Sequence, residues 1–262
     1  MLLRTALLAT ALLGGCATPA PNRTLLLLPA DAILLGEQHD APDHQRIHLE
    51  VAEVLAAQGQ LAALVLEMAE QGHSTAALPR NASAADVQAA LAWNDAGWPW
   101  AAYGPAILAA VHAGVPVLGA NLPRALMRGA MANQRLDAEL PGPALKAQQQ
   151  AIRLGHCGLL PESQVGPMTR VQIARDQAMA QTLQAAAIPL KTVVLLAGSG
   201  HVDPGLGIPQ YLPKNFVSKT VLLQAKPVQL APKSIVNFDS TWTTPSIPPI
   251  DYCGDLENKM PG

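Results

Sequence analysis

Four short apolar runs, each followed at once by polar residues, constrain the fold of this chain more than any other feature. They cover residues 34–36, 62–66, 115–120 and 192–197, and stretches with a helical spacing of apolar residues separate them. Short apolar runs that alternate with helices are typical of a parallel sheet, whose strands are buried on both faces. A fifth run covers residues 220–224. We therefore predict an α/β fold with a central, mainly parallel sheet flanked by helices, and with helical insertions.

The polar residues that follow these runs are candidates for a functional site. They are Glu37 and His39 after the first run, Glu67 after the second, Asn121 after the third and His201 after the fourth. In a parallel sheet the carboxyl ends of the strands lie along one edge, where ligands usually bind. We therefore expect these side chains to converge, although they come from distant parts of the sequence.

Three interpretations of Glu37, His39, Glu67 and His201 are open. Two carboxylates and two imidazoles suit a divalent metal such as zinc or manganese. Without a metal, a histidine and a glutamate with perturbed pKa values in one cleft can act as a general acid and base. In the third interpretation the role is structural, and each side chain caps a loop or hydrogen-bonds the backbone at the end of a strand.

The first residues have the features of a bacterial lipoprotein signal peptide. Arg4 supplies a positive charge, residues 6–13 are apolar but too few to span a bilayer, and the sequence Leu-Gly-Gly-Cys ends at Cys16. We predict that residues 1–15 are removed and that Cys16 carries the lipid. Because Ala17 is not the aspartate associated with inner-membrane retention, we expect an anchor in the outer membrane. The alternative is an ordinary secretory signal with an incidental cysteine.

The remainder of the chain is predicted to be one domain. Residues 16–29 are expected to form a tether and residues 30–262 a single α/β domain. Its last part, residues 226–262, is rich in proline, which predicts an irregular tail. The formal net charge is only −2 at pH 7, so the composition indicates neither a nucleic-acid-binding surface nor a polybasic membrane patch.

Two cysteines follow the lipobox, Cys157 and Cys253. An exported chain folds in an oxidising compartment, where a pair of thiols tends to form a disulfide. A bridge between these two would close a loop of nearly a hundred residues and hold the Pro-rich tail against the body of the domain. The alternative is two buried free thiols.

Seven segments, taken in order, resemble the ChaN-like haem-binding lipoproteins. They are LLGEQHD, LVLEM, WNDAGWPWAAY, GANLPR, HCGLLP, RVQIARDQAMA and LAGSGHV, within roughly residues 30–225. These lipoproteins belong to a superfamily that also holds the Tiki and TraB proteins and the erythromycin-esterase-like hydrolases. The resemblance implies an α/β domain with helical additions, an outer-membrane location and a role in haem or iron uptake. It also implies an ancestral pocket at Glu37, His39, Glu67 and His201, which the catalytic relatives use for metal or hydrolytic chemistry.

A haem site needs a flat apolar slot, an axial ligand for the iron and partners for the propionates. A tyrosine phenolate favours ferric iron. Tyr103 is the first candidate for this ligand, because it lies near Trp93, Trp98 and Trp100 in a sequence that is otherwise poor in aromatic residues. Tyr211, in a proline-flanked loop, is the second. The alternative for Tyr103 is a core position with a hydrogen-bonded hydroxyl.

Three further residues are candidates for contacts with haem. His44 and His48 are four residues apart, so they share one face of a predicted helix, which faces either the pocket or solvent. Arg124 comes shortly after the third apolar run, where a guanidinium can pair with a propionate.

Two classes of function follow from these features. The first is a lipid-anchored haem-binding protein that is not an enzyme, that uses a tyrosine or histidine ligand and that holds haem at the interface of a homodimer. Its expected partners are haem, the membrane and an outer-membrane haem receptor. The second is a metal-dependent hydrolase of the esterase or peptidase type that uses Glu37, His39, Glu67 and His201. The lipobox and the resemblance favour the first class.

Overall fold

A six-stranded sheet lies at the centre of the computed structural model, which describes residues 22–226 and 237–257. The strands follow the order β3-β2-β4-β1-β5-β6 across the sheet. Their bounds are Ala32–Glu37 for β1, Leu61–Glu70 for β2, Val117–Asn121 for β3, Thr192–Gly198 for β4, Ser218–Ala225 for β5 and Ser240–Thr244 for β6. Neighbouring strands all run parallel, so their carboxyl ends share one edge, which confirms the predicted sheet.

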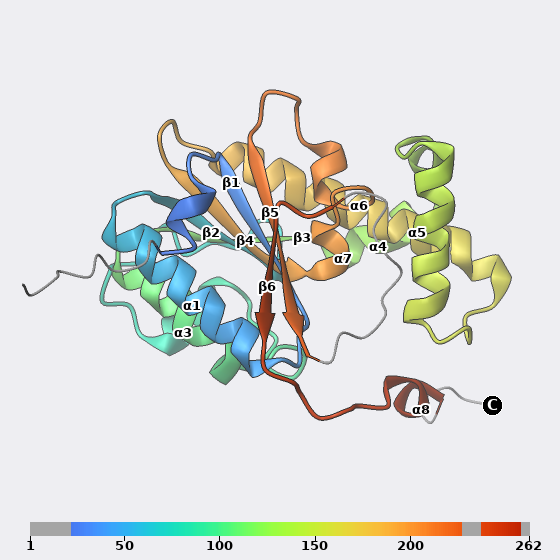
Figure 1. Cartoon of the computed structure of the whole chain (residues 1–262), viewed down its shortest axis with the longest axis horizontal. Helices are drawn as coiled ribbons and strands as arrows, with labels where there is room; N and C mark the ends of the chain where they lie inside the picture. Colours follow the sequence, from blue (N-terminus) through green and yellow to red (C-terminus); the bar gives the residue numbers. More distant parts are fainter. Residues whose placement is uncertain (1–21, 227–236, 258–262) are drawn as a thin grey trace, which may run out of the picture.

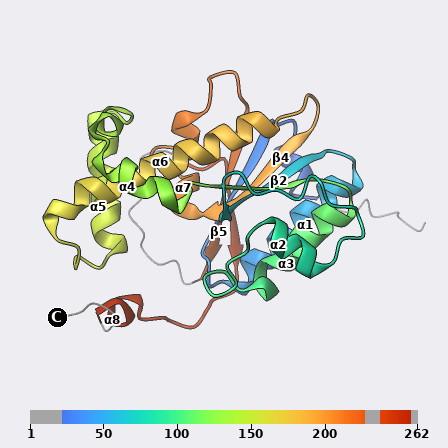
Figure 2. The ribbon, with the colours of Figure 1, turned by 180° about the vertical axis from the view of Figure 1, so that it is seen from behind.

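Helices cover both faces of this sheet (Figures 1 and 2). Ile33 and Leu35 of β1 pack with α1 and α3, whereas Ala32 and Leu34 face α6. Burial on both faces explains why the strands read as unbroken apolar runs. The helices are α1 Pro42–Ala57, α2 Ala84–Ala90, α3 Trp100–His112, α4 Arg124–Ala132, α5 Gly142–Gly155, α6 Glu162–Ala186, α7 Ser199–Val202 and α8 Tyr252–Glu257, with short 3-10 helices η1 Leu25–Leu27, η2 Gln134–Ala138 and η3 Ile208–Tyr211.

The segment between β3 and β4 forms a helical insertion. There α4, α5 and the first part of α6 surround an apolar cluster of their own, which includes Ala130, Leu136 and Val171. Figure 1 shows α5 standing beside the sheet rather than on one of its faces. The second part of α6 continues onto the sheet, where Met179 and Leu183 are buried. This long helix therefore connects the insertion to the sheet.

The helix α3 begins at Trp100, within the tryptophan-rich segment that the sequence analysis singled out. The Asp95 carboxylate accepts a hydrogen bond from the Trp100 backbone N–H at 2.7 Å, which satisfies one of the free donors at the start of the helix. Tyr103 consequently lies inside α3 and points into the core.

The predicted irregular tail is wrong for residues 240–244, which form β6 and pair with β5. Threonines alternate here with Trp242, which is 8% exposed and packs in the core. A period of two with β-branched residues on either side of a tryptophan is typical of an edge strand. The Arg23 guanidinium lies 4.3 Å from the centre of the Trp242 ring, so a residue close to the start of the domain contacts this last strand.

The predicted disulfide between Cys157 and Cys253 is confirmed, with 5.6 Å between their Cα atoms. It joins the turn after α5 to α8. Residues 1–21, with the predicted signal peptide and Cys16, lie outside the described residues. Thr24 and Leu27, in the range predicted as a tether, are buried. Within the described part of the chain, no helix is long and apolar enough to cross a membrane.

Candidate functional site

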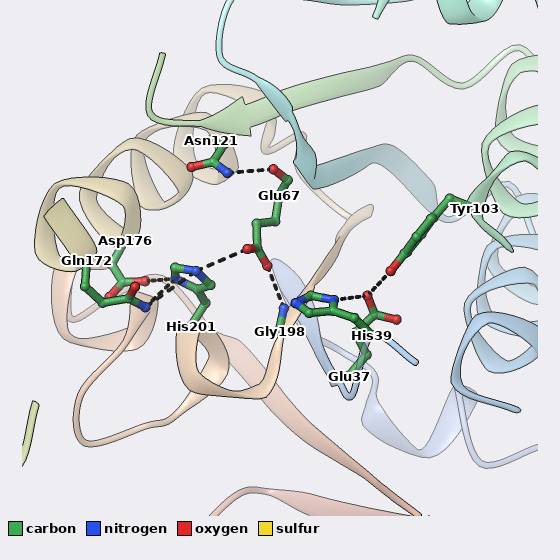
Figure 3. A network of polar contacts seen from close by, with 9 residues as sticks. All are labelled: Glu37, His39, Glu67, Tyr103, Asn121, Gln172, Asp176, Gly198 and His201. Atoms are coloured by element: carbon green, nitrogen blue, oxygen red, sulfur yellow. Dashed lines mark hydrogen bonds and ion pairs between the residues drawn. The ribbon is translucent and has the colours of Figure 1, made fainter. Parts of the chain in front are cut away.

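The structure brings Glu37, His39, Glu67 and His201 together at the carboxyl edge of the sheet (Figure 3). Glu37 ends β1, and in the register of the sheet it lies opposite Gly198, the last residue of β4. All four side chains line a cavity of about 540 Å³. The convergence expected from the strand ends is therefore present, and the two glutamates are almost fully buried.

Glu37 is the centre of one hydrogen-bond network. Its Oε1 accepts hydrogen bonds from the Tyr103 hydroxyl and from His39 Nδ1, both at 2.7 Å. Its Oε2 accepts one from the Gln45 side-chain amide at 2.8 Å. Burial opposes ionisation of Glu37, but the nearby imidazoles of His48 and His39 and these hydrogen bonds outweigh it and lower the pKa of the carboxyl. Glu37 is therefore a carboxylate that accepts bonds from both helices of one layer, α1 and α3.

Glu67 is the centre of a second network, which continues into α6. Its Oε2 accepts a hydrogen bond from the Gly198 backbone N–H at 2.7 Å, and its Oε1 lies 3.4 Å from His201 Nε2. The other imidazole nitrogen, Nδ1, lies 2.5 Å from Oδ1 of Asp176. The side chain of Asn121 donates to the backbone carbonyl of Glu67 at 2.9 Å, so it supports the strand rather than the carboxylate.

In this second network the carboxylates of Glu67 and Asp176 share one imidazole, that of His201. Burial alone would lower the pKa of His201, but the charges of Glu67 and Asp176 outweigh it and raise that pKa. Glu67 responds in the opposite direction, because its pairing with His201 outweighs its burial and lowers its pKa to about 2. One imidazolium cannot compensate both carboxylates fully, and burial raises the pKa of Asp176. His201 is therefore protonated at neutral pH.

Gly198 allows the two networks to approach each other. A Cβ atom at this position would lie 2.9 Å from Nε2 of His39 and 3.5 Å from Oε2 of Glu67. A side chain here would therefore displace His39 from its place between the two glutamates. The Gly-Ser-Gly sequence after the fourth apolar run thus serves close packing at the cavity wall.

The four residues are arranged as ion pairs and not as a metal site. Within residues 22–226 and 237–257, no three histidine, cysteine or acidic side chains have an arrangement that could hold a metal ion. Each glutamate already has an imidazole partner, so a metal would have to replace existing bonds. The donor set that the sequence predicts for zinc or manganese is present in composition but not in geometry.

The two tyrosines predicted as haem ligands do not line the cavity. Tyr103 is 2% exposed, and its hydroxyl donates to Glu37. Burial, followed by the charge of Glu37, raises the pKa of its phenol. Tyr211 packs between the sheet and the insertion, and its buried hydroxyl has no hydrogen-bond partner among the described residues. Its pKa is raised by burial and by the charge of Asp176.

The other predicted haem contacts also lie away from the cavity lining. His44 is buried, accepts a hydrogen bond from the Gln38 backbone N–H at 3.0 Å and contacts the Thr244 hydroxyl at 3.1 Å. His48 is buried beneath Glu37, and burial lowers its pKa to about 4, so it is neutral. Arg124 is exposed at the start of α4.

Tyr252 and its neighbour in space, Asp40, are cavity residues that the sequence analysis missed. The Tyr252 hydroxyl donates a hydrogen bond to the Asp40 carboxylate, and the residue is 47% exposed. Partial burial and then this hydrogen bond raise the pKa of the phenol. Because Tyr252 precedes Cys253, the predicted disulfide was the available signal that it lies against the body of the protein.

We predict that Glu67→Gln lowers the free energy of unfolding by about 3–5 kcal/mol at pH 7, because it leaves a buried imidazolium without its main counter-ion. Stabilisation by Glu67 is complete above its ordinary pKa of 4.5 and is lost as the pH falls towards its folded pKa of about 2. Urea unfolding should therefore show a difference between variant and wild type that shrinks below pH 4.5.

The matched control is Glu162→Gln, which removes an exposed ion pair with Arg153 and should change stability little. Equal effects of the two substitutions would contradict the central role given to Glu67. A difference between Glu67→Gln and wild type that is independent of pH would contradict the assigned ionisation.

Comparison with known proteins supports the resemblance seen in the sequence. Residues 26–212 match the family described as haem-binding uptake, Tiki superfamily, ChaN. The structure is similar to that of ChaN of Campylobacter jejuni, described as showing cofacial haem binding, with a TM-score of 0.67 and 25% identity over 79% of this chain and 86% of that one. It matches the type III effector HopBA1 with a TM-score of 0.43 and 17% identity, over 84% and 91% of the two chains.

No curated protein matches the sequence. The family match nevertheless covers well over half of the chain, and it spans β1 to η3, including Glu37, Glu67 and His201. The chain therefore belongs to the ChaN family of haem-binding uptake proteins, within the Tiki superfamily.

Proposed function

We propose that the cavity at the carboxyl edge of the sheet binds haem as the cargo of a lipid-anchored uptake protein. The observation that carries this proposal is the lining of the cavity, which includes the partly exposed Tyr252 and three apolar residues of β5. Membership of a haem-binding family supports it. The similarity to ChaN of Campylobacter jejuni, a protein described as showing cofacial haem binding, also supports it.

The cavity fits the general requirements of a haem slot. Its volume of about 540 Å³ lies in the range of small-molecule sites, which is roughly 300–1,000 Å³. Leu222, Leu223 and Ala225 of β5 form an apolar wall. His39 lies at the polar side, its side chain is 40% exposed, and hydrogen bonding and charge from Glu37 and Glu67 raise its pKa in spite of burial. A cation in that position can pair with a propionate.

Tyr252 replaces Tyr103 and Tyr211 as our candidate for the iron ligand, because it is the one that lines the cavity. Its phenol is protonated at neutral pH, since its pKa is raised above its ordinary value. The Asp40 carboxylate accepts the hydrogen bond of this hydroxyl, so it would orient the phenol oxygen towards the cavity as a ligand for ferric iron. We infer that Asp40 assists Tyr252 through this hydrogen bond.

The alternative function, a metal-dependent hydrolase, has less support. A general base needs a free lone pair at neutral pH, and His201 is held as an imidazolium by Glu67 and Asp176. No metal-binding arrangement exists among the described residues. In the haem-binding function His39 is the member of these networks that contacts the ligand, and the others shape the wall of the cavity, which agrees with their closed hydrogen bonding.

We also propose that two copies of the chain meet at the cavity mouths when haem is bound. Half-exposure of Tyr252 leaves one side of the site open, and cofacial binding, as named for the Campylobacter jejuni protein, brings two haems together. An outer-membrane haem receptor is the proposed partner for transfer. Sedimentation velocity should show a monomer that becomes a dimer on addition of hemin; an unchanged sedimentation coefficient at saturation would contradict the dimer.

For ligation, we predict that Tyr252→Phe removes the tyrosinate-type absorbance of the hemin complex and weakens binding by about tenfold or more. Tyr103→Phe is the matched control, because its hydroxyl serves Glu37 and does not reach the cavity. Protons compete with ferric iron for the phenolate, so the affinity of the wild type should fall as the pH is lowered. Loss of the spectrum in Tyr103→Phe and its retention in Tyr252→Phe would reverse the assignment.

For localisation, we predict that Cys16→Ser releases the protein from the outer membrane. The lipobox supports acylation of Cys16, since small residues precede the cysteine at the end of a signal peptide. Fractionation of cells that express wild type or variant measures the effect, with retention of the disulfide as evidence that the variant was still exported. Complete membrane retention of the variant would exclude a lipid anchor at this residue.

A further inference from the structure

We propose that the Cys157–Cys253 disulfide positions Tyr252 at the cavity, so that the oxidised chain binds haem and the reduced chain releases it. This inference rests on the proposed function and adds a redox control to it. Cys253 follows Tyr252 directly in α8, and its sulfur is bonded to the turn after α5. The disulfide therefore links the helical insertion to the residue that completes the cavity.

Among the described residues, the segment that carries Tyr252 has few other attachments. Residues 245–251 connect β6 to α8 without helix or strand, and most of them are exposed. Figure 1 shows α8 beyond the ends of β5 and β6, away from the helices that cover the sheet. Tyr252 itself contributes the hydrogen bond to Asp40. The Cys157–Cys253 bond is thus the strongest attachment of this segment, which does not pair with the sheet.

The conformational entropy lost on ordering this segment makes the disulfide decisive for the position of Tyr252. Ordering each residue of an exposed, unpaired segment costs conformational entropy. The exposed hydrogen bonds of the Tyr252 hydroxyl, with Asp40 and with Gln38, are too weak to offset that cost over the residues between β6 and α8. The disulfide at Cys253 reduces the number of conformations that the segment can adopt before a ligand binds, so the phenol stays near the cavity.

The backbone at Cys157 supports a dedicated role for this cysteine. Cys157 has a φ of 56° and Gly158 a φ of 70°, so both lie in the left-handed region at the end of α5. The Cys157 N–H donates to Leu154 O and the Gly158 N–H to Arg153 O, both at 2.9 Å, which closes the helix. The left-handed position at a helix end favours glycine. A cysteine there is unfavourable for the backbone, and the disulfide gives a reason for its presence.

The redox step is a thiol–disulfide exchange with a dithiol as the reductant. One thiolate of the dithiol attacks a sulfur of the bridge, the S–S bond breaks, and the second thiol then resolves the mixed disulfide. The protein gains two electrons and two protons and has two thiols, while the dithiol becomes a disulfide. Cys253 belongs to an exposed part of the chain, so a reductant can reach the bridge without unfolding the domain.

The experiment is a hemin titration of the mature domain without Cys16, followed by absorbance. Oxidised wild type, wild type reduced with dithiothreitol, and the double variant Cys157→Ser/Cys253→Ser are compared at a temperature far below their unfolding midpoints. We expect the reduced protein and the double variant to bind hemin at least about tenfold more weakly and to lose the tyrosinate-type spectrum. Dithiothreitol should not change the affinity of the double variant, which controls for direct effects of the reductant on haem.

Each outcome separates this inference from the proposed function. If oxidised wild type does not bind hemin, the proposed function fails. If oxidised wild type binds hemin and the double variant binds it with the same affinity and spectrum, haem binding stands and the positioning role of the disulfide is overturned. A bridge that only stabilised the fold would lower the unfolding temperature of the double variant and leave its hemin spectrum intact.

Discussion

The ion pair between Glu67 and His201 is the interaction on which the architecture of the site depends. Both side chains are almost completely buried; Glu67 lies in the last part of β2, which ends at Glu70, and His201 lies in α7. A buried charge is tolerated only when it is paired and hydrogen-bonded, so neither residue can occupy its place without the other. Glu67 also accepts the Gly198 N–H, which fixes the point where β4 turns into α7. The last part of β2 is thus fixed relative to the turn from β4 into α7 at the cavity wall.

Glu37 and Glu67 are each connected by hydrogen bonds to the helices on a different face of the sheet. Glu37 accepts hydrogen bonds from Gln45 of α1 and from Tyr103 of α3, which cover one face. Glu67 acts through His201 on Asp176 of α6, which covers the other. Each layer of helices is therefore connected to the strand ends by one carboxylate. Since α6 also enters the helical insertion, the same network relates the position of the insertion to that of the cavity.

The sequence was sufficient to predict the sheet and the convergence of its strand ends, because burial on both faces leaves uninterrupted apolar runs. It was not sufficient for Asp176, which belongs to a regular helix and has no strand-end signal. Tyr103 was attractive for its aromatic surroundings, but only its distance to Glu37 shows that its hydroxyl is already used. Trp242 was hidden by neighbouring prolines, although its alternation with threonines is typical of a strand. Tyr252 has no local signal of its own, and only the predicted disulfide at the next residue indicated that it lies against the body of the protein.

The closed networks also agree with the binding role proposed for the cavity. The carboxylates of Glu37 and Glu67 are bonded to imidazoles, a hydroxyl and a backbone amide, so coordinating a metal would cost them these partners. The ligand contacts proposed above are His39, the β5 residues of the cavity and the phenol of Tyr252, which comes from outside the sheet. In that proposal the sheet edge supplies rigidity, and the C-terminal segment supplies the group that would meet the haem. The liganding residue could then be attached or released without disturbing the buried charges of Glu67 and His201.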